Sequence, residues 1–239
     1  MELHSTELKS FATTFISRTD LYAQQTASGR YSCIRKPLTL DLVASHLRGE
    51  LTLGAYALSS ESQASWICLD ADDEPEWARI LTMARSLESR GLPSYMEPSR
   101  RGGHLWLFTP PLPARRARTL GKQLQLEFDL ETIELFPKQD RLSSGPGSLV
   151  RLPLGIHRKS GRRYHFITPE GRALSPTIRG QVRGQDFQPA ELLQSEGNRV
   201  AHNAMQANQR SLLLLADKLY RRNPAEWRKR AATREAALA

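Results

Sequence analysis

The chain has few cysteines, no long hydrophobic run and no internal repeat. Cys33 and Cys68 are the only two cysteines in 239 residues, and neither has a metal-ligand spacing to another cysteine or histidine. A zinc site and a disulfide framework are therefore not indicated, and a reducing cytoplasm is the expected location. No uninterrupted apolar run is long enough to cross a bilayer, and the polar start at residues 1–4 is unlike a signal peptide. We expect a soluble protein with no membrane partner.

Positive charge is unevenly distributed along the chain. Residues 1–136 carry 15 basic and 17 acidic side chains, whereas residues 137–183 carry 10 basic and only 2 acidic ones. A second basic segment, residues 198–239, has 9 basic and 3 acidic side chains. Such a concentration suits a polyanion such as nucleic acid or a nucleotide triphosphate, although a solvated basic surface is also common.

The order of predicted elements indicates an α+β protein. Helices are expected at residues 5–15, at 38–49, at 75–89 and at 113–128. Strands are expected at residues 31–34, 53–58, 63–70, 94–98, 104–108, 132–136, 149–154 and 164–167. Between residues 63 and 136 the order is strand, helix, hairpin, helix, strand, which predicts an RRM-like βαββαβ sheet with both helices on one face. An α/β extension precedes this unit, and a basic helical tail follows it.

The most informative motif is a group of acidic residues that ends a hydrophobic strand. Side chains alternate along a strand, so Asp70 and Asp72 point the same way. Two carboxylates held together repel each other unless a cation lies between them, and oxygen ligands favour Mg²⁺ or Mn²⁺. The alternative is an acidic start to the next helix, which explains Asp73 and Glu74 but not the pair on one face.

Three further segments carry chemistry-bearing side chains. Gly102-Gly103-His104 lets backbone amides approach an anion, although a lone histidine after a glycine turn is more often a packing residue. Glu134 lies between apolar neighbours and by itself reads as a solvent-facing strand residue. The basic run from Arg151 to Lys159 is either a phosphate clamp or a solvated edge, and charge alone does not separate the two.

Taken in order, these segments resemble the archaeo-eukaryotic primase superfamily. The resemblance lies in Cys68-Leu69-Asp70-Ala71-Asp72, in Gly103-His104-Leu105-Trp106-Leu107-Phe108, in the segment from Glu134 to Gln139 and in the segment from Arg151 to Lys159. It covers about residues 10–170. The branch it is most similar to contains CRISPR-associated primase-polymerases and the primases of conflict (TOTE) systems.

The resemblance implies a role for each matching position. Asp70, Asp72 and Glu134 would be catalytic and would hold two Mg²⁺ or Mn²⁺ ions for nucleotidyl transfer. The implied nucleotide-binding residues are His104, Ser99, Arg101, Gly103, Lys138, Arg151, His157 and Lys159. Arg115, Arg158 and Arg162 are the candidates for nucleic-acid contact. The side chain of Glu134 is longer than the aspartate that is usual in the wider superfamily, and it can still complete a metal site.

The sequence therefore predicts a DNA primase-polymerase domain over residues 1–188, divided into an N-terminal subdomain (1–62) and an RRM-like catalytic subdomain (63–188). Residues 189–239 form the predicted basic tail. The expected partners are a DNA template and primer, a dNTP or NTP, and further domains or CRISPR and conflict-system proteins, and the chain itself is expected to be a monomer. Two alternatives stay open, a metal-dependent nuclease that uses Asp70, Glu134 and Lys138, and an inactive RRM-like nucleic-acid-binding or replication module.

Overall fold

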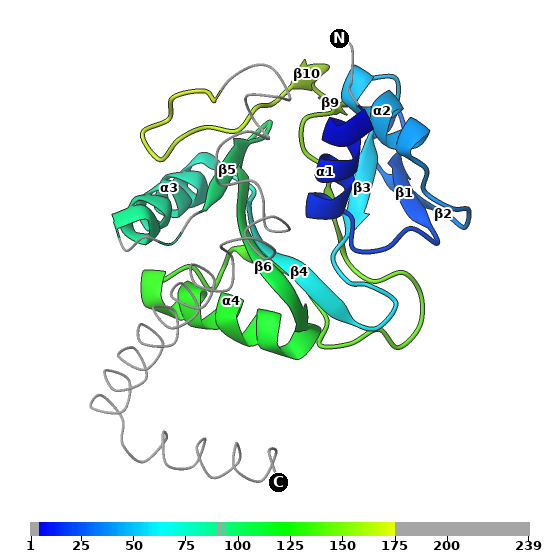
Figure 1. Ribbon diagram of the computed structural model, residues 1–239. Helices are drawn as coiled ribbons and strands as arrows, with labels where there is room; N and C mark the ends of the chain where they lie inside the picture. The colour runs from blue at the N-terminus through cyan, green and yellow to red at the C-terminus, as the bar shows by residue number, and fades with distance from the viewer. Residues whose placement is uncertain (1–4, 90–91, 93, 175–239) are drawn as a thin grey trace, which may run out of the picture. The chain divides into compact units, whose positions relative to one another are not determined.

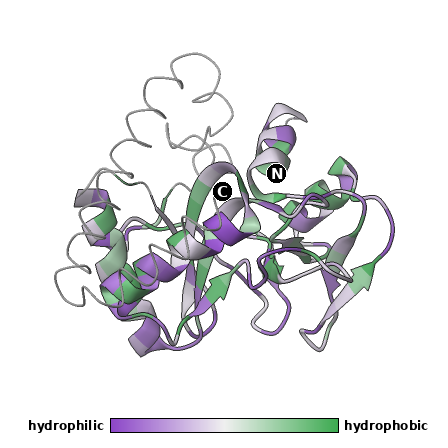
Figure 2. Ribbon diagram, turned by 90° about the horizontal axis from the view of Figure 1, so that it is seen from below, coloured by the Kyte–Doolittle hydropathy of each residue, from purple (hydrophilic) through white to green (hydrophobic). Residues whose placement is uncertain are grey.

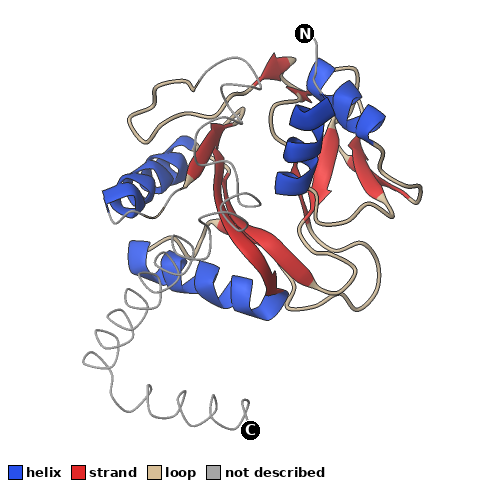
Figure 3. Ribbon diagram, viewed as in Figure 1, coloured by secondary structure: helices blue, strands red, loops and turns tan. Residues whose placement is uncertain are grey.

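A computed structural model describes residues 5–89, 92 and 94–174 of the chain. Two four-stranded antiparallel sheets and four helices make up most of this part (Figures 1 and 3). The predicted α+β mixture of helices and strands is confirmed, and the sheets are antiparallel. Within the described residues, no helix has the length and hydropathy needed to cross a membrane. The predicted tail at 189–239 lies outside the described residues.

The sheet that carries most of the predicted motifs, called here the second sheet, has the strand order β5-β6-β4-β7. Its elements follow one another as β4 (Gln63–Ala71), α3 (Glu74–Ser89), β5 (Tyr95–Pro98), β6 (Gly103–Pro113), α4 (Ala114–Phe128) and β7 (Glu134–Phe136). This is the predicted order of strands and helices. In Figure 1, α3 and α4 lie on one side of this sheet and α1 lies on the other.

The first sheet has the strand order β2-β1-β3-β8. It consists of β1 (Tyr22–Gln25), β2 (Tyr31–Ile34), β3 (Leu53–Tyr56) and β8 (Leu149–Arg151), with α1 (Ser5–Phe15) and α2 (Leu40–Arg48) beside it. Strand β1 was not predicted, because its residues contain two glutamines and precede a polar turn. β8 pairs with β3 across about a hundred residues of sequence, so this sheet is completed from outside residues 1–62.

A small two-stranded ribbon follows β8. It is formed by β9 (Ile156–His157) and β10 (Arg162–Arg163). The strand predicted at residues 164–167 is wrong: only Ile167 forms isolated bridges, with Met96 and Ala173. The apolar pattern there instead reflects packing, because the Phe166 side chain is buried in the core next to α1.

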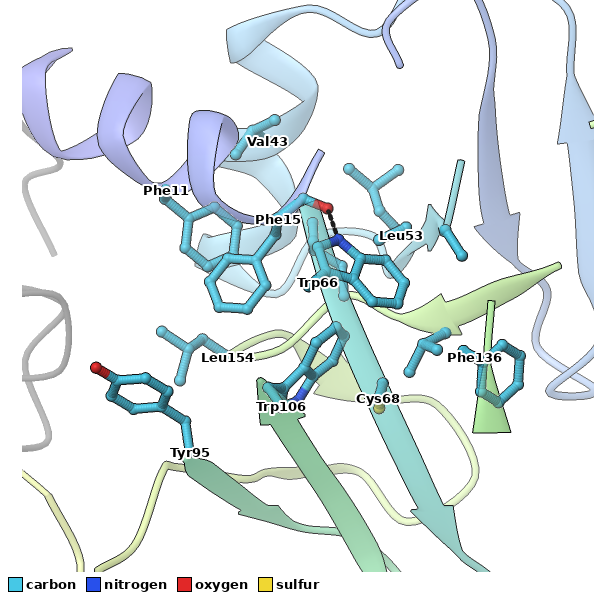
Figure 4. Close-up of a cluster of buried hydrophobic side chains, with 14 of the residues drawn as sticks. Phe11, Phe15, Val43, Leu53, Trp66, Cys68, Tyr95, Trp106, Phe136 and Leu154 are labelled. Carbon is cyan, nitrogen blue, oxygen red and sulfur yellow. Dashed lines mark hydrogen bonds between the residues drawn. The ribbon is translucent and has the colours of Figure 1, made fainter. Parts of the chain in front are cut away.

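Side chains along each strand of the second sheet alternate between its two faces, and each face packs into a different hydrophobic core. Leu69 and Leu105 face α3 and α4, whose surfaces are both hydrophobic and hydrophilic (Figure 2). Cys68 and Trp106 face the opposite way, toward α1 and the first sheet, where Figure 4 shows the Trp66 indole donating a hydrogen bond to the Phe15 carbonyl oxygen. The face that carries even-numbered residues of β4 and β6 is therefore buried at one end.

Candidate active site

Four polar side chains form a row across one end of that same face. Asp70 on β4 is paired in register with His104 on β6 and with Glu134 on β7, and His104 is paired with Glu97 on β5. Residues directly opposite each other in neighbouring strands share a face, so Glu97, His104, Asp70 and Glu134 lie side by side. We call these four residues the polar row.

A parallel row of apolar residues lies two positions away and explains why the polar row has a fixed place. Tyr95, Trp106, Cys68 and Phe136 are paired across the same four strands, and all four side chains are buried (Figure 4). Because the apolar row is packed against the first sheet and α1, the polar row sits at the edge of a rigid core.

Asp72 follows the end of β4, and it makes a different contact from its neighbour Asp73. The Asp72 carboxylate accepts a hydrogen bond from Arg101, at 2.7 Å from Nη2 to Oδ1. Its neighbour Asp73 caps the next helix: the Glu76 amide donates to Asp73 Oδ1 at 2.9 Å. The helix-start interpretation of Asp73 is thus confirmed, while Asp72 remains directed toward the β5–β6 turn.

Two basic side chains pair with the two more exposed carboxylates, Asp72 and Glu134. Lys138 Nζ lies 2.8 Å from Glu134 Oε1, and Arg101 pairs with Asp72 as described. Both cations are well exposed, with 45% of the Lys138 side chain and 58% of the Arg101 side chain accessible. Exposed pairs of this kind contribute at most about 1 kcal/mol, so they are easily exchanged for another cation.

Asp70 is the most enclosed of the three carboxylates. Burial raises the pKa of its carboxyl, and the negative charges of Asp72 and Glu134 raise it further, while His104 and Arg151 oppose the shift. The three carboxylates therefore act on one another, which is the electrostatic situation that a divalent cation relieves. Their oxygen donors suit Mg²⁺ or Mn²⁺ in kind.

The described residues contain no group of three histidine, cysteine or acidic side chains that is already close enough to enclose a metal ion. Asp72 and Glu134 are turned toward Arg101 and Lys138 in the ion pairs above. Rotation of these two exposed carboxylates toward Asp70 is the adjustment that a metal site requires. The donor set thus fits Mg²⁺ or Mn²⁺ in its chemistry, and Asp70 is the least exposed of the three candidate ligands.

The β5–β6 turn brings backbone close to the end of β4. A Cβ atom on Gly102 would overlap the Ala71 carbonyl group, and one on Gly103 would lie 2.7 Å from the Glu97 carbonyl oxygen. Glycine is required at both positions by this packing, in addition to any contact with an anion. Ser99 closes the turn, since its amide donates to the Gly102 carbonyl oxygen at 2.8 Å.

Glu97 is the residue of this region that sequence reasoning missed. Its side chain is fully buried; Oε2 is 2.9 Å from His104 Nδ1, and Oε1 is 2.8 Å from Arg151 Nη2. Arg151 comes from β8, so this ion pair joins the two sheets. The Nη1 atom of Arg151 is buried and has no hydrogen-bond partner among the described residues. The available signal was a charged residue in an otherwise apolar strand that leads into the glycine turn.

The other basic residues predicted to bind nucleotide or nucleic acid lie outside the polar row, on the β9–β10 ribbon or on α4. The β9–β10 ribbon and its turn carry His157, Arg158, Lys159 and Arg162. Burial lowers the pKa of His157, and the positive charges of Arg151, Arg100 and Lys159 lower it further. Its ring also packs edge-on against Tyr164, over which the Arg151 guanidinium lies. Arg115, by contrast, is on α4, which covers the opposite face of the second sheet.

Comparisons with known proteins identify the family of the chain. Residues 6–179 match the model of a family described as "TOTE conflict system, Archaeo-Eukaryotic Primase domain". No curated protein matches the chain. Among solved structures, the primase-polymerase domain of cyanophage S-2L is 14% identical, with a TM-score of 0.46 over 72% of this chain and 94% of that one.

A second solved structure is the polymerase domain of Mycobacterium tuberculosis ligase D in complex with DNA. It is 13% identical, with a TM-score of 0.32 over 73% of this chain and 76% of that one. The family match spans both sheets and the whole polar row, from α1 to the last described residue. The chain belongs to the archaeo-eukaryotic primase domains of TOTE conflict systems.

Proposed function

We propose that this domain is a DNA primase-polymerase that adds nucleotides from dNTPs or NTPs to a primer 3′-hydroxyl and is able to begin primers on an unprimed template. The observation that carries the proposal is the in-register row of His104, Asp70 and Glu134, with Asp72 at the end of the same strand. Family membership supports this chemistry, since nucleotidyl transfer is the activity associated with these domains. The catalytic sheet is proposed to be RRM-like.

Asp70, Asp72 and Glu134 would hold the two Mg²⁺ or Mn²⁺ ions. Bound there, the ions would supply an activated 3′-hydroxyl and neutralise charge on the triphosphate. The chain itself places positive groups beside these carboxylates: Arg101 pairs with Asp72 and Lys138 pairs with Glu134. If the two carboxylates held metal ions instead, Arg101 and Lys138 would be free to pair with phosphate oxygens.

His104 and Arg151 are further candidates for contact with the nucleotide. His104 Nε2 lies 3.4 Å from Asp70 Oδ1, so a ligand bound at Asp70 would also lie close to this ring nitrogen. The Arg151 Nη1 group is a buried donor that no described residue uses. We propose that both residues contact the incoming nucleotide, together with the β5–β6 turn.

The arrangement disfavours a simple RNA-binding module. Such modules stack bases on exposed aromatic side chains of the sheet. Here Tyr95, Trp106 and Phe136, which lie on the same face of the sheet as the polar row, are buried against the first sheet and α1. The less enclosed end of the face carries carboxylates instead, which repel a nucleic-acid backbone unless a cation is present.

The test is extension of a labelled primer on a DNA template with dNTPs or NTPs plus Mg²⁺ or Mn²⁺, beside an unprimed template. We expect metal-dependent products that disappear in Asp70→Ala/Asp72→Ala. The matched control is Asp73→Asn/Glu74→Gln. It also removes two negative charges, but from the start of α3, and it should retain synthesis.

Other outcomes contradict the proposal. Synthesis that survives the double alanine substitution would remove the assigned metal ligands. A shortened primer in place of an extended one would favour the nuclease, and DNA binding without either product would favour the inactive module.

A further inference from the structure

Glu97 is a charged residue in a place that is costly for charge. None of its side chain is accessible, and its strand neighbours Tyr95 and Met96 belong to the two hydrophobic cores. Burial by itself raises the pKa of the Glu97 carboxyl, but Arg151 and the hydrogen bond from His104 outweigh this and hold the pKa below its usual value. The carboxylate is therefore kept charged by its two partners.

Stability alone gives little reason for this cluster. Replacing a buried ion pair by apolar side chains of similar volume is often neutral or stabilising. Arg151 even keeps one buried donor, Nη1, without a partner in the described part of the chain. A cluster that is costly to bury and lies next to the candidate active site calls for another explanation.

The geometry at His104 supplies one. Glu97 Oε2 is 2.9 Å from Nδ1 of the ring, and a carboxylate only accepts, so Nδ1–H is the donor. The ring also packs edge-on against Trp106, at 6.0 Å between centroids. With one nitrogen tied and one edge packed, the other nitrogen, Nε2, is directed at Asp70.

We propose that Glu97 is a positioning residue: it holds the His104 ring so that Nε2 faces the catalytic carboxylates and the incoming nucleotide, while Arg151 balances its charge from the first sheet. This role rests on the proposed function, because Nε2 has a substrate to contact only if the polar row binds a nucleotide. Glu97 itself touches neither the nucleotide nor the metal ligands.

The position of the ring proton tests the contact without any activity. In ¹⁵N-labelled wild-type protein at fixed pH, the His104 Nδ1 shift should show a bound proton. In Glu97→Gln, the amide oxygen is drawn to Arg151 and the amide NH₂ faces the ring, so the proton should leave Nδ1. A bare Nδ1 in the wild type, or identical nitrogen shifts in the variant, would overturn the proposal.

Glu97→Gln leaves the buried Arg151 charge without its partner and could fail to fold, so a second variant removes both charges of the pair. Glu97→Leu/Arg151→Leu removes both charges together and offers Nδ1 no acceptor, so it should fold and still lose the Nδ1 proton. Retention of that proton would show that another group orients the ring.

A double-mutant cycle with His104→Ala then connects the contact to the reaction. Glu97→Gln should raise the nucleotide KM by about tenfold or more, as loss of an orienting partner commonly does. Added to His104→Ala, it should change KM little, because there is no ring left to orient. Additive effects of the two substitutions would overturn the positioning role. A wild-type protein that makes no product would instead count against the proposed function, and the nitrogen shifts would still decide the contact.

Discussion

Asp70 on β4 and Glu134 on the edge strand β7 lie directly opposite each other in the second sheet. The burial of Asp70 raises the pKa of its carboxyl, and Glu134 and Asp72 add to the rise. A divalent cation would remove this repulsion, which is why the metal site should be measurable even without DNA.

Binding of Mn²⁺ should therefore stabilise the domain against heat. A ligand present at a hundred times its Kd stabilises the native state by about 2.7 kcal/mol. We expect the melting temperature to rise with Mn²⁺ in the wild type and to stay constant in Asp70→Asn. Asp73→Asn, which only alters the helix cap, is the control that should keep the rise. An equal rise in both variants would place the ion elsewhere.

Acid should destabilise the domain through His46. Burial lowers the pKa of this histidine to about 4, from the usual value of about 6.5. Its Nδ1 accepts a hydrogen bond from the Leu53 amide, and its Nε2–H donates to the Pro153 carbonyl oxygen. Both nitrogens of the neutral ring are therefore hydrogen-bonded, and a second proton on Nδ1 would break the bond from Leu53. Between pH 6.5 and 4 the unfolded chain binds a proton that the folded chain excludes, and stability falls as the pH falls.

The loss attributable to His46 is about 2 kcal/mol at pH 5 relative to pH 7.5. Urea unfolding at the two pH values measures it. In His46→Gln, whose amide is able to accept and donate in the same directions, this part of the pH dependence should disappear. The same pH dependence in both proteins would show that His46 is not the group responsible.

DNA binding should depend on the β9–β10 ribbon. Each Lys or Arg that neutralises a phosphate of single-stranded DNA adds about 0.7 to the slope of log K against log salt. Arg158→Ala/Arg162→Ala should thus weaken binding and lower the slope by about 1.4. Arg85→Ala, an exposed substitution on α3, is the control and should leave the slope unchanged. A full slope in the double variant would place the DNA elsewhere.

Gly102→Ala should destabilise the β5–β6 turn. The added Cβ overlaps the backbone at Ala71, directly after Asp70. Overpacking of this kind typically costs about 1–3 kcal/mol. Arg100→Ala in the same turn is exposed and should change the unfolding free energy by less than about 0.5 kcal/mol. Chemical denaturation of both variants provides the comparison, and equal stabilities would mean that the backbone yields without cost.

Local patterns were sufficient for the elements that carry their own signals. The helices α1, α3 and α4 and the hairpin of β5 and β6 occur where periodicity, Pro75 and the Gly102-Gly103 turn predicted them. β1 was missed because its glutamine-rich sequence becomes a strand only between β2 and β3. The strand predicted at residues 164–167 failed for the opposite reason: Phe166 is buried in the core, and only Ile167 forms isolated bridges, so no continuous strand results.

The sequence by itself singled out Asp70 and Asp72 as candidates for the chemistry, because side chains alternate along a strand and this prediction needs no tertiary information. Only the tertiary structure decided what stands beside them. Strand register set Asp70 between His104 and Glu134, and the meeting of two sheets buried Glu97 against Arg151. Residues 54 positions apart in the chain are joined there by packing, a long-range term that no local pattern of residues encodes.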